Sequence, residues 1–440
     1  MAERVLVLRG GSVLGPDGQQ RADVSVRGDT IVEVAESVET PKGAIVLDAG
    51  GCLIGPGLVD LHTHLRQPGR EEAETVESGA RAAALGGYTA LVAMPNTEPA
   101  IDSAGVARDV LALGRSALAE VAVAGAITVG RAGHALAPMG ELAALGVRLF
   151  TDDGAGVQDG GLMRRALDYA KGLGVTLAQH CEDDCLAGGG AMHEGCWSSR
   201  LGLPGIPAAA EESMVARDIQ LARLTGARVH FLHLSTAGSV ELVRRAKADG
   251  VDVTAEAAPH HMLLTHDLVA GYDPVFKVNP PLRTDDDVTA VIEGLCDGTI
   301  DAIATDHAPH APEVKDVPFD QAPPGMLGLQ TALPVAWQVL APRLSPERIF
   351  ALMSTQPAAI AGLGPTDARV SGHSAHGGPV EVGATANLCI FDPNGTTQVE
   401  VARLASRSRN SPYLGRTFAG AVRHTVLRGE AVVIDGEAQR

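Results

Sequence analysis

Aromatic residues are scarce in this sequence. Phe, Trp and Tyr make up only 3% of its 440 residues, whereas apolar residues as a whole make up 45% and charged residues 20%. This balance is ordinary for a globular protein and excludes a disordered chain or a coiled coil. The length is sufficient for one large α/β domain together with a smaller one.

The sequence also lacks long apolar runs and an excess of positive charge. No stretch is apolar enough to span a bilayer, and the run at residues 5–8 is too short for a signal peptide, so we expect a cytoplasmic protein without a membrane partner. Lys and Arg number 35 against 53 Asp and Glu, which gives a formal net charge of −18. This charge argues against nucleic acid as a partner, but a local positive pocket could still hold an anionic substrate.

Cysteine is sparse as well. The six cysteines are scattered along the chain, which indicates reduced thiols rather than a disulfide framework. Cys181, Cys185, His193 and Cys196 could be imagined as a structural zinc site, but their spacing fits no familiar pattern. Incidental thiols are therefore the preferred interpretation.

The most informative stretch that is present covers residues 55–66. Residues 58–61 form a short apolar run bounded by Gly and Pro, which predicts a buried strand, and His62 and His64 follow it. Alternate side chains of a strand share a face, so both imidazoles can bind one metal ion. Arg66, two residues further on, returns toward the same side.

Strand-like sequence occurs at both ends of the chain. Residues 5–49 show apolar alternation with a turn signal at residues 15–18, and the sequence pattern of residues 7–14 recurs at residues 426–433. We therefore expect the two ends to pair in a small β-sandwich domain. The predicted division is residues 1–55 and 376–440 for the small domain and residues 56–375 for the central domain.

Within the central domain, apolar strand-like runs alternate with helical stretches such as residues 77–85, 161–173 and 211–224. This alternation predicts parallel strands with crossover helices. The eight candidate strands are Leu58–His64, Ala90–Asn96, Val121–Thr128, Val147–Asp153, Thr176–His180, Arg228–Leu234, Asp252–Ala257 and Asp301–Asp306. The predicted fold class is α/β with a (β/α)8 TIM barrel.

Nearly every candidate strand ends in a side chain that can bind a metal or a substrate. These residues are His62, His64, Asn96, Asp152, Asp153, His180, His233 and Asp306, with Asn279 and His310 on following loops. A lone histidine at a strand end is more often a hydrogen-bonded core residue. In a barrel, however, all of these positions converge on the C-terminal mouth, where such folds place their chemistry.

Four histidines and two aspartates form a ligand set that suits zinc. The set exceeds what one open catalytic zinc needs, so a binuclear site with a bridging carboxylate and a bridging hydroxide is the natural hypothesis. This chemistry predicts hydrolysis of an amide-like bond, with Asp306 placed to move the proton. Asp152 and Asp153 compete for the bridging position, because adjacent residues on a strand point apart.

Three other histidines receive supporting roles. His230 precedes His233 by three residues on the same candidate strand, so we expect its side chain to face the opposite way and to pack among helices. His260 and His261 lie near the predicted mouth, and support of the ligands is favoured over direct binding.

The ordered motifs resemble those of the amidohydrolase superfamily and, within it, the class I dihydroorotases. The resemblance runs from the N-terminal strands to Gly429. It is densest at residues 60–69, 94–97, 150–154, 179–183, 231–235, 279–283 and 304–310. A single His-x-His pair is weak support for a family, whereas this ordered series is very specific.

The resemblance implies a role for each matching residue. His62, His64 and Asp306 would bind one zinc ion and His180 and His233 the other, with Asp153 as the bridge and Asp306 as the catalytic acid and base. Substrate contacts would come from the side chains of His64, Arg66, Asn96, Asn279 and His310 and from the backbone of Pro324 and Gly325. The implied reaction is the reversible cyclisation of N-carbamoyl-L-aspartate to dihydroorotate in pyrimidine synthesis. A homo-oligomer is expected, and an aspartate transcarbamoylase is a candidate partner.

Two other interpretations of the sequence are a hydantoinase-like enzyme and a barrel without catalytic activity. Hydantoinases and allantoinases bridge their metals with a carboxylated lysine, but no lysine ends the fourth candidate strand, and Lys171 lies within a predicted helix. A catalytically silent barrel that only scaffolds a transcarbamoylase is expected to have lost ligands, and none is missing here.

Overall fold

The computed structural model describes residues 4–15 and 18–440, so the two central residues of the turn predicted at residues 15–18 lie outside it. Strands from both ends of the described chain share one sheet, in the order β19-β18-β17-β16-β5-β1-β2-β3 with β4 beside β1. Their bounds are β1 Val5–Gly15, β2 Gly18–Arg27, β3 Thr30–Ala35, β4 Ile45–Asp48, β5 Leu53–Pro56, β16 Leu388–Gln398, β17 Thr417–Leu427, β18 Glu430–Ile434 and β19 Glu437–Ala438.

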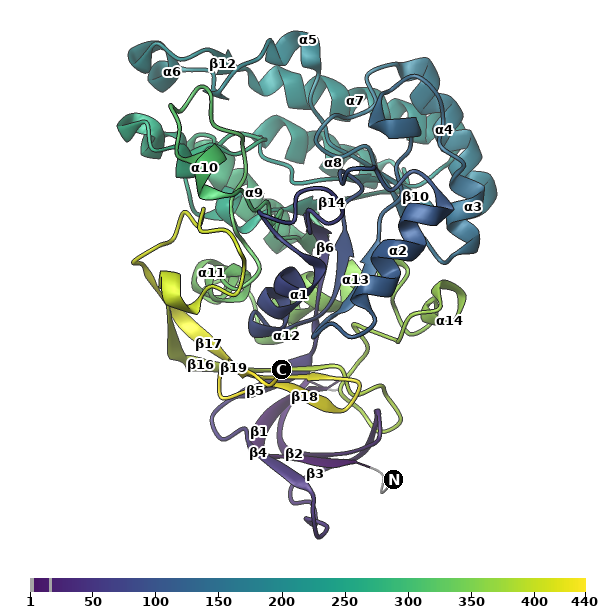
Figure 1. Cartoon of the computed structure of the whole chain (residues 1–440), viewed down its shortest axis with the longest axis vertical. Helices are drawn as coiled ribbons and strands as arrows, with labels where there is room; N and C mark the ends of the chain where they lie inside the picture. The colour runs from purple at the N-terminus through teal and green to yellow at the C-terminus, as the bar shows by residue number, and fades with distance from the viewer. Residues whose placement is uncertain (1–3, 16–17) are drawn as a thin grey trace.

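Strand β5 joins the two ends of the chain. It runs parallel to β1, with Ser12 opposite Leu53, and antiparallel to β16, with Ile390 opposite Ile54. Figure 1 shows this sheet, with strands from both ends of the chain, below the helical part of the molecule. The pairing of the two termini is as predicted. All strands of this terminal region belong to one hydrogen-bonded sheet. The description of the small domain as a β-sandwich stays a prediction.

Eight short parallel strands lie between residues 58 and 303, all of which are described. They are β6 Leu58–Thr63, β7 Tyr88–Ala93, β8 Glu120–Val123, β9 Leu149–Phe150, β10 Thr176–Gln179, β13 Val229–Phe231, β14 Val253–Ala257 and β15 Ala302–Ile303. Their parallel pairings follow the order of the sequence in two groups, β6-β7-β8 and β9-β10-β13-β14-β15. Each strand corresponds to one of the eight predicted runs, although most are shorter.

The two groups of strands are linked at both edges. A parallel bridge between Gly125 and Phe150 joins the chain after β8 to β9, and another between Thr63 and His307 joins β6 to the chain after β15. The Thr305 amide also donates to Asp60 Oδ1 over 2.7 Å. The last strand is therefore tied back to the first.

A helix follows each of the eight strands. These helices are α1 Val76–Leu85, α2 Ala104–Gly114, α3 Met139–Ala144, α4 Gly160–Leu173, α7 Ala208–Thr225, α8 Ala237–Ala248, α9 Asp285–Asp297 and α11 Ala332–Leu340. Local sequence sets their ends: Asp159 accepts from the Leu162 amide at the start of α4, and Gly174 adopts a φ of 67° at its end. The helices predicted at residues 77–85, 161–173 and 211–224 correspond to α1, α4 and α7.

The described chain also contains shorter α-helices and strands. They are α5 Asp184–Ala187, β11 Met192–His193, α6 Cys196–Leu201, β12 Gly205–Ile206, α10 Pro312–Lys315, α12 Pro346–Phe350, α13 Gln356–Ala361 and α14 Ala368–Ser371. Among the described residues, none of the helices combines the length and the apolar character that crossing a bilayer requires.

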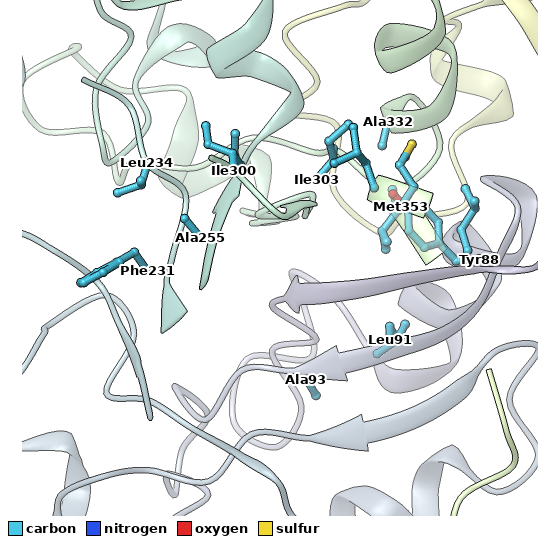
Figure 2. Packing of buried hydrophobic residues seen from close by; sticks show 14 of the residues in the cluster. Tyr88, Leu91, Ala93, Phe231, Leu234, Ala255, Ile300, Ile303, Ala332 and Met353 are labelled. Carbon is cyan, nitrogen blue, oxygen red and sulfur yellow. The ribbon is translucent and has the colours of Figure 1, made fainter. Parts of the chain in front are cut away.

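The largest core lies between the strands and the surrounding helices. Figure 2 shows Leu91 and Ala93 of β7 near Tyr88, and Phe231 of β13 near Ala255 of β14. The cluster continues into α4, α7, α8 and α11, so alternate strand residues face the helices. Small residues such as Ala93 and Ala255 let the elements approach closely, which explains how a chain poor in aromatics builds a core of this size.

Candidate metal centre and substrate pocket

Six buried side chains meet at the carboxyl ends of the parallel strands. His62 lies within β6, and the others follow a strand: His64 after β6, Asp153 after β9, His180 after β10, His233 after β13 and Asp306 after β15. Five of them form two groups that could each hold a metal ion, one with His62 and His64 and the other with His180 and His233. Asp153 belongs to both groups.

The Asp153 carboxylate lies between the two pairs of histidines. Its Oδ2 atom is 3.3 Å from His62 Nε2 and 3.5 Å from His64 Nε2. Its Oδ1 atom is 3.6 Å from His180 Nδ1 and 3.5 Å from His233 Nε2. Each carboxylate oxygen therefore faces a different pair, which is the arrangement that a bridge between two cations requires.

Unsatisfied polar atoms at the centre fit a bound cation. Within the described chain, His62 Nε2 and Asp153 Oδ1 are buried and form no hydrogen bond. Burial alone would raise the pKa of Asp153, but the charge of His62 and the nearby imidazoles of His180 and His233 hold it well below its usual range. A carboxylate surrounded by imidazoles is a donor set for zinc or a similar divalent ion.

Asp152, the rival for the bridging position, points elsewhere. Its Oδ1 atom accepts hydrogen bonds from the amides of Ile127 and Thr128, at 2.8 and 3.0 Å, and its Oδ2 atom accepts one from the Thr128 hydroxyl. The geometry therefore assigns Asp152 to holding the loop after β8 and leaves Asp153 facing the histidines.

Asp306 lies beside the first pair of histidines. Its Oδ1 atom is 3.2 Å from His64 Nε2 and 3.6 Å from His62 Nε2. Burial would raise the pKa of Asp306, but the hydrogen bond from His64 and the charges of His62 and His233 lower it below its ordinary value. The side chain is therefore ionised at neutral pH and able to accept a proton.

Three residues of the site adopt backbone conformations that non-glycine residues rarely take. The φ angles are 57° at Arg66, 29° at His233 and 45° at Asp306. Such conformations cost free energy and persist where the surrounding structure enforces them. They break the alternation of side chains at the strand ends.

The expectation for His230 is wrong. Its neighbours Val229 and Phe231 pack in the core that includes the helices, whereas His230 Nε2 lies 3.0 Å from Glu256 Oε2. The prediction failed because β13 ends at Phe231 and the positive φ of His233 reverses the side-chain direction that strict alternation implies.

Glu256 is a supporting residue that lies outside the sequence motifs described above. Its Oε1 atom lies 2.9 Å from His62 Nδ1, so the carboxylate orients this imidazole with Nε2 toward the centre. Burial would raise the pKa of Glu256, but hydrogen bonds from His230 and His62 lower it to about 2. An acidic residue inside the apolar run of β14 was the available signal in the sequence.

The predicted substrate contacts surround the same centre. Asn96 Oδ1 lies 2.9 Å from His64 Nδ1, and Asn279 Nδ2 lies 3.5 Å from His180 Nε2. Arg66 is only 5% exposed, and its Nε atom donates to the Pro309 carbonyl over 3.1 Å. Burial lowers the pKa of Arg66 to about 10, so the guanidinium remains charged.

His310 reaches the loop that contains Pro324 and Gly325. Its Nε2 atom lies 2.8 Å from the Pro324 carbonyl oxygen. Burial and the nearby charge of Arg66 lower the pKa of His310 to about 3, so its ring is neutral near pH 7. The structure thus brings the predicted contact residues close to the six candidate ligands.

Other candidate ligands lie apart or remain supporting residues. Cys181 is a buried free thiol, whereas Cys185 and Cys196 are exposed, and the metal-compatible groups among the described residues do not include them. His260 and His261 are buried beside each other, with ring centroids 4.4 Å apart, and His261 Nε2 lies 3.0 Å from the Pro280 carbonyl oxygen.

Comparison with known proteins agrees with this site. A family model described as dihydro-orotase-like matches residues 51–239. The dihydroorotase of Streptomyces coelicolor is 49% identical over 436 residues, covering 98% of this chain and 99% of the relative. The chain belongs to the dihydroorotase family. The dihydroorotase of Mycobacterium tuberculosis is 50% identical over 423 residues, and the match covers 95% of this chain and 96% of the relative.

Solved structures of related cyclic amidases share the fold. An L-hydantoinase (dihydropyrimidinase) from Arthrobacter aurescens has a TM-score of 0.85 at 25% identity, covering 99% of this chain and 97% of that one. A D-hydantoinase from a Thermus species has a TM-score of 0.81 at 25% identity, and the match covers 98% of this chain and 96% of that one. Hydrolysis of a cyclic amide is the reaction class that this dihydroorotase-family chain shares with them.

Proposed function

We propose that this dihydroorotase-family chain catalyses the reversible cyclisation of N-carbamoyl-L-aspartate to dihydroorotate with two zinc ions. The observation that carries this proposal is the position of Asp153, whose two oxygens face different pairs of histidines. His62, His64 and Asp306 would hold one ion, His180 and His233 the other, and Asp153 both. When bound, the ions would activate a water molecule and polarise the amide carbonyl.

Asp306 would carry the proton between water and the ring nitrogen. As an ionised carboxylate beside His64, it can accept a proton during ring opening and deliver it to the departing nitrogen. Ring closure reverses this transfer and consumes a proton, because a substrate carboxylate becomes part of a neutral ring imide. Lower pH should therefore favour dihydroorotate at equilibrium.

Arg66, Asn96, Asn279 and His310 would orient the substrate. The guanidinium of Arg66 is buried and charged, and its Nε atom is engaged by Pro309, which leaves the terminal nitrogens for the free carboxylate of the ring. Neutral His310 contacts the Pro324 carbonyl, which places the turn of Pro324 and Gly325 against this pocket.

The domain division and the barrel are part of the same proposal. Eight parallel strands in sequence order, with the chain after β15 bridged to β6, support a closed (β/α)8 barrel over residues 56–375. Residues 1–55 and 376–440 would form the small domain. Oligomerisation, an aspartate transcarbamoylase partner and a cytoplasmic location stay predictions.

A hydantoinase-like reaction on a neutral ring is the second candidate, because the solved neighbours include hydantoinases of similar fold. Asp153 occupies the bridging position that a carboxylated lysine would fill in those enzymes, and Arg66 offers a buried positive charge to a carboxylated ring. Both features favour dihydroorotate.

Variants of Arg66 separate the two candidates. Arg66→Ala and Arg66→Lys should each weaken the use of dihydroorotate roughly ten-fold or more, because the two-pronged contact with the carboxylate is lost. Zinc content should stay unchanged. Steady-state turnover of dihydroorotate and of dihydrouracil, which lacks the carboxylate, together with metal analysis, tests this expectation.

One combination of results would contradict the proposal. A wild-type protein that hydrolyses dihydrouracil as well as dihydroorotate, with neither activity reduced in Arg66→Ala, would reject the carboxylate pocket and favour the hydantoinase-like reaction.

A further inference from the structure

The loop at residues 323–328, here named the substrate loop, takes its shape from contacts with other segments. The Gly325 amide donates to the Lys277 carbonyl over 2.9 Å, and the Ala308 amide donates to the Met326 carbonyl over 2.8 Å. The loop forms no helix or strand of its own. Its conformation therefore depends on the groups that bind its backbone.

Lys315, at the end of α10, is the first such group. Its ammonium donates to the Pro323 carbonyl over 2.8 Å and to the Lys277 carbonyl over 3.0 Å. Lys277 precedes Asn279 by two residues, so one side chain links the substrate loop to the loop that carries a predicted substrate contact. The Lys277 carbonyl is also the acceptor for Gly325.

The surroundings of Lys315 are unusual for a lysine. The residue is only 5% exposed, and the hydrogen bonds of its ammonium go to backbone carbonyls rather than to a carboxylate. Burial, together with the charge of Lys277, lowers the pKa of Lys315 to about 7. Burying an amine without a counter-ion costs free energy. Its two hydrogen bonds to carbonyls therefore indicate that Lys315 serves to hold the backbone and does not form an ion pair.

Asn410 holds the other side of the substrate loop. Its Nδ2 atom donates to the carbonyls of Gly325 and Ala308, each over 3.0 Å, and its Oδ1 atom accepts from the His310 amide over 3.2 Å. Its own carbonyl accepts from the Leu327 amide over 3.2 Å. One buried asparagine thus joins the substrate loop to the segment that carries Asp306 and His310.

Asn410 comes from a distant part of the chain. It lies in the C-terminal strap, residues 399–416, which leaves the terminal sheet after β16 and returns to it at β17. In Figure 1 this yellow segment rises from the sheet toward α10 and α11. The strap is fastened to the helical part by the Ser408 hydroxyl, which donates to the Ala73 carbonyl over 2.7 Å.

Close packing leaves the substrate loop little freedom at its centre. Gly325 has a φ of 143°, and a Cβ atom there would lie 2.8 Å from His310 Nε2 and 2.8 Å from the Ala308 methyl group. Only glycine allows the loop to lie this close to His310. A small displacement of the loop would therefore change the surface that it presents to the pocket.

We propose that Lys315 and Asn410 are positioning residues that clamp the substrate loop from two sides and hold the Pro324–Gly325 turn against the substrate. Neither side chain touches the reacting atoms, and each acts through the backbone that it binds. This inference rests on the proposed substrate pocket. Because Asn410 lies in the C-terminal strap, substrate binding would also depend on this extension of the terminal sheet.

Two substitutions with matched controls test the clamp. Lys315→Met keeps the aliphatic stem and removes the donors, and Asn410→Asp keeps the acceptor for His310 and removes the donors to Gly325 and Ala308. The matched controls are Lys171→Met, since Lys171 also donates to a carbonyl, that of Thr225 over 2.7 Å, and Asn387→Asp, since Asn387 donates to the Ala375 carbonyl over 2.8 Å.

We expect both test variants to raise KM for dihydroorotate roughly ten-fold while kcat falls much less, because loosening the loop weakens substrate binding. Zinc content and Tm should stay within the range of the matched controls. Amide hydrogen exchange should become faster at residues 325–328, which follow the two prolines of the loop, in the test variants only; this readout is independent of turnover.

The remaining outcomes reject the clamp. Unchanged KM in Lys315→Met and in a folded Asn410→Asp overturns it, as does a loss of Tm and kcat without a change in KM, because either result indicates a merely structural role. If Asn410→Asp does not fold, Lys315→Met decides alone. A wild-type protein that does not convert dihydroorotate rejects the proposed function itself, whereas normal wild-type turnover with unaffected variants rejects only the clamp.

Discussion

Asp152 and Asp153 are adjacent and chemically identical, and their surroundings alone give them different tasks. Asp152 binds the Ile127 and Thr128 amides and holds a loop, whereas Asp153 faces four histidines. One carboxylate satisfies backbone donors, and the other leaves a buried oxygen without a hydrogen bond among the described residues. At the residue scale, a bound cation explains the second environment and is not needed for the first.

The pair Asp153→Asn and Asp152→Asn should therefore behave differently. Asp153→Asn removes the charge and one of two bridging oxygens, so zinc content and turnover should both fall sharply while the protein stays folded. Asp152→Asn should retain zinc and lose about 1–3 kcal/mol of stability, because an amide cannot accept all the hydrogen bonds that the carboxylate accepts. Elemental analysis and urea unfolding measure the two effects. Equal loss of zinc in both variants would contradict the assignment of the bridge.

At the scale of elements, β8 is tied to the chain that leads from α14 to the terminal sheet. Glu120 Oε1 lies 3.0 Å from His373 Nδ1, and Glu120 Oε2 lies 3.2 Å from His376 Nε2. Burial would raise the pKa of Glu120, but hydrogen bonds from His373 and His376 lower it far below its ordinary value of 4.5. A carboxylate with a lowered folded-state pKa stabilises the fold above the unfolded value and loses this contribution as the pH falls.

Glu120→Gln should accordingly lower the free energy of unfolding in a pH-dependent way. The difference from wild type should be full above pH 4.5 and should shrink as the pH falls below that value toward the folded-state pKa. Chemical unfolding from about pH 6 downward measures it. Glu77→Gln, which removes an exposed partner of Arg81, is the control and should change stability little at any pH. A difference that does not depend on pH would show that the Glu120 contacts do not stabilise the fold through charge.

At the scale of the whole molecule, the two ends of the chain meet at Gly28 and Gly429. Gly429 has a φ of 70°, and a Cβ atom there would lie 1.9 Å from the Gly28 carbonyl oxygen. The obstructing atom belongs to backbone between β2 and β3, so it cannot move as a flexible side chain would. This contact joins the turn between β2 and β3 to the turn between β17 and β18.

Gly429→Ala should therefore destabilise the protein by more than the roughly 1 kcal/mol that a left-handed alanine costs by itself. Gly436→Ala is the matched control, because Gly436 has a φ of 76° but its nearest neighbouring atom would lie 3.9 Å from the added methyl group. Urea unfolding of both variants measures the excess. KM for dihydroorotate should remain at the wild-type value in both, since neither glycine lies near the site. Equal stability of the two variants would show that the contact between the chain ends adjusts without cost.

The order of the elements and the residue types of the site can be predicted from the amino-acid sequence. Apolar runs and the caps of helices are local features, so the eight parallel strands and helices α1, α4 and α7 follow from spacing alone. The recurrence of residues 7–14 at residues 426–433 likewise predicted the shared terminal sheet. His62, His64, His180, His233 and Asp306 stood out because polar side chains directly follow or end apolar runs.

The direction of particular side chains, and the distant residues that support them, depend on how the folded chain packs. The positive φ at His233 breaks strict alternation, which is why His230 was misplaced. Asp152 and Asp153 are distinguished only by their partners, which are the amides of Ile127 and Thr128 for Asp152 and the histidines for Asp153. Glu256, Lys315 and Asn410 act through distant partners: His62 is 194 positions from Glu256, Lys277 is 38 positions from Lys315, and Gly325 is 85 positions from Asn410. No local pattern encodes such a contact, because it exists only when the strands, the substrate loop and the C-terminal strap have packed together.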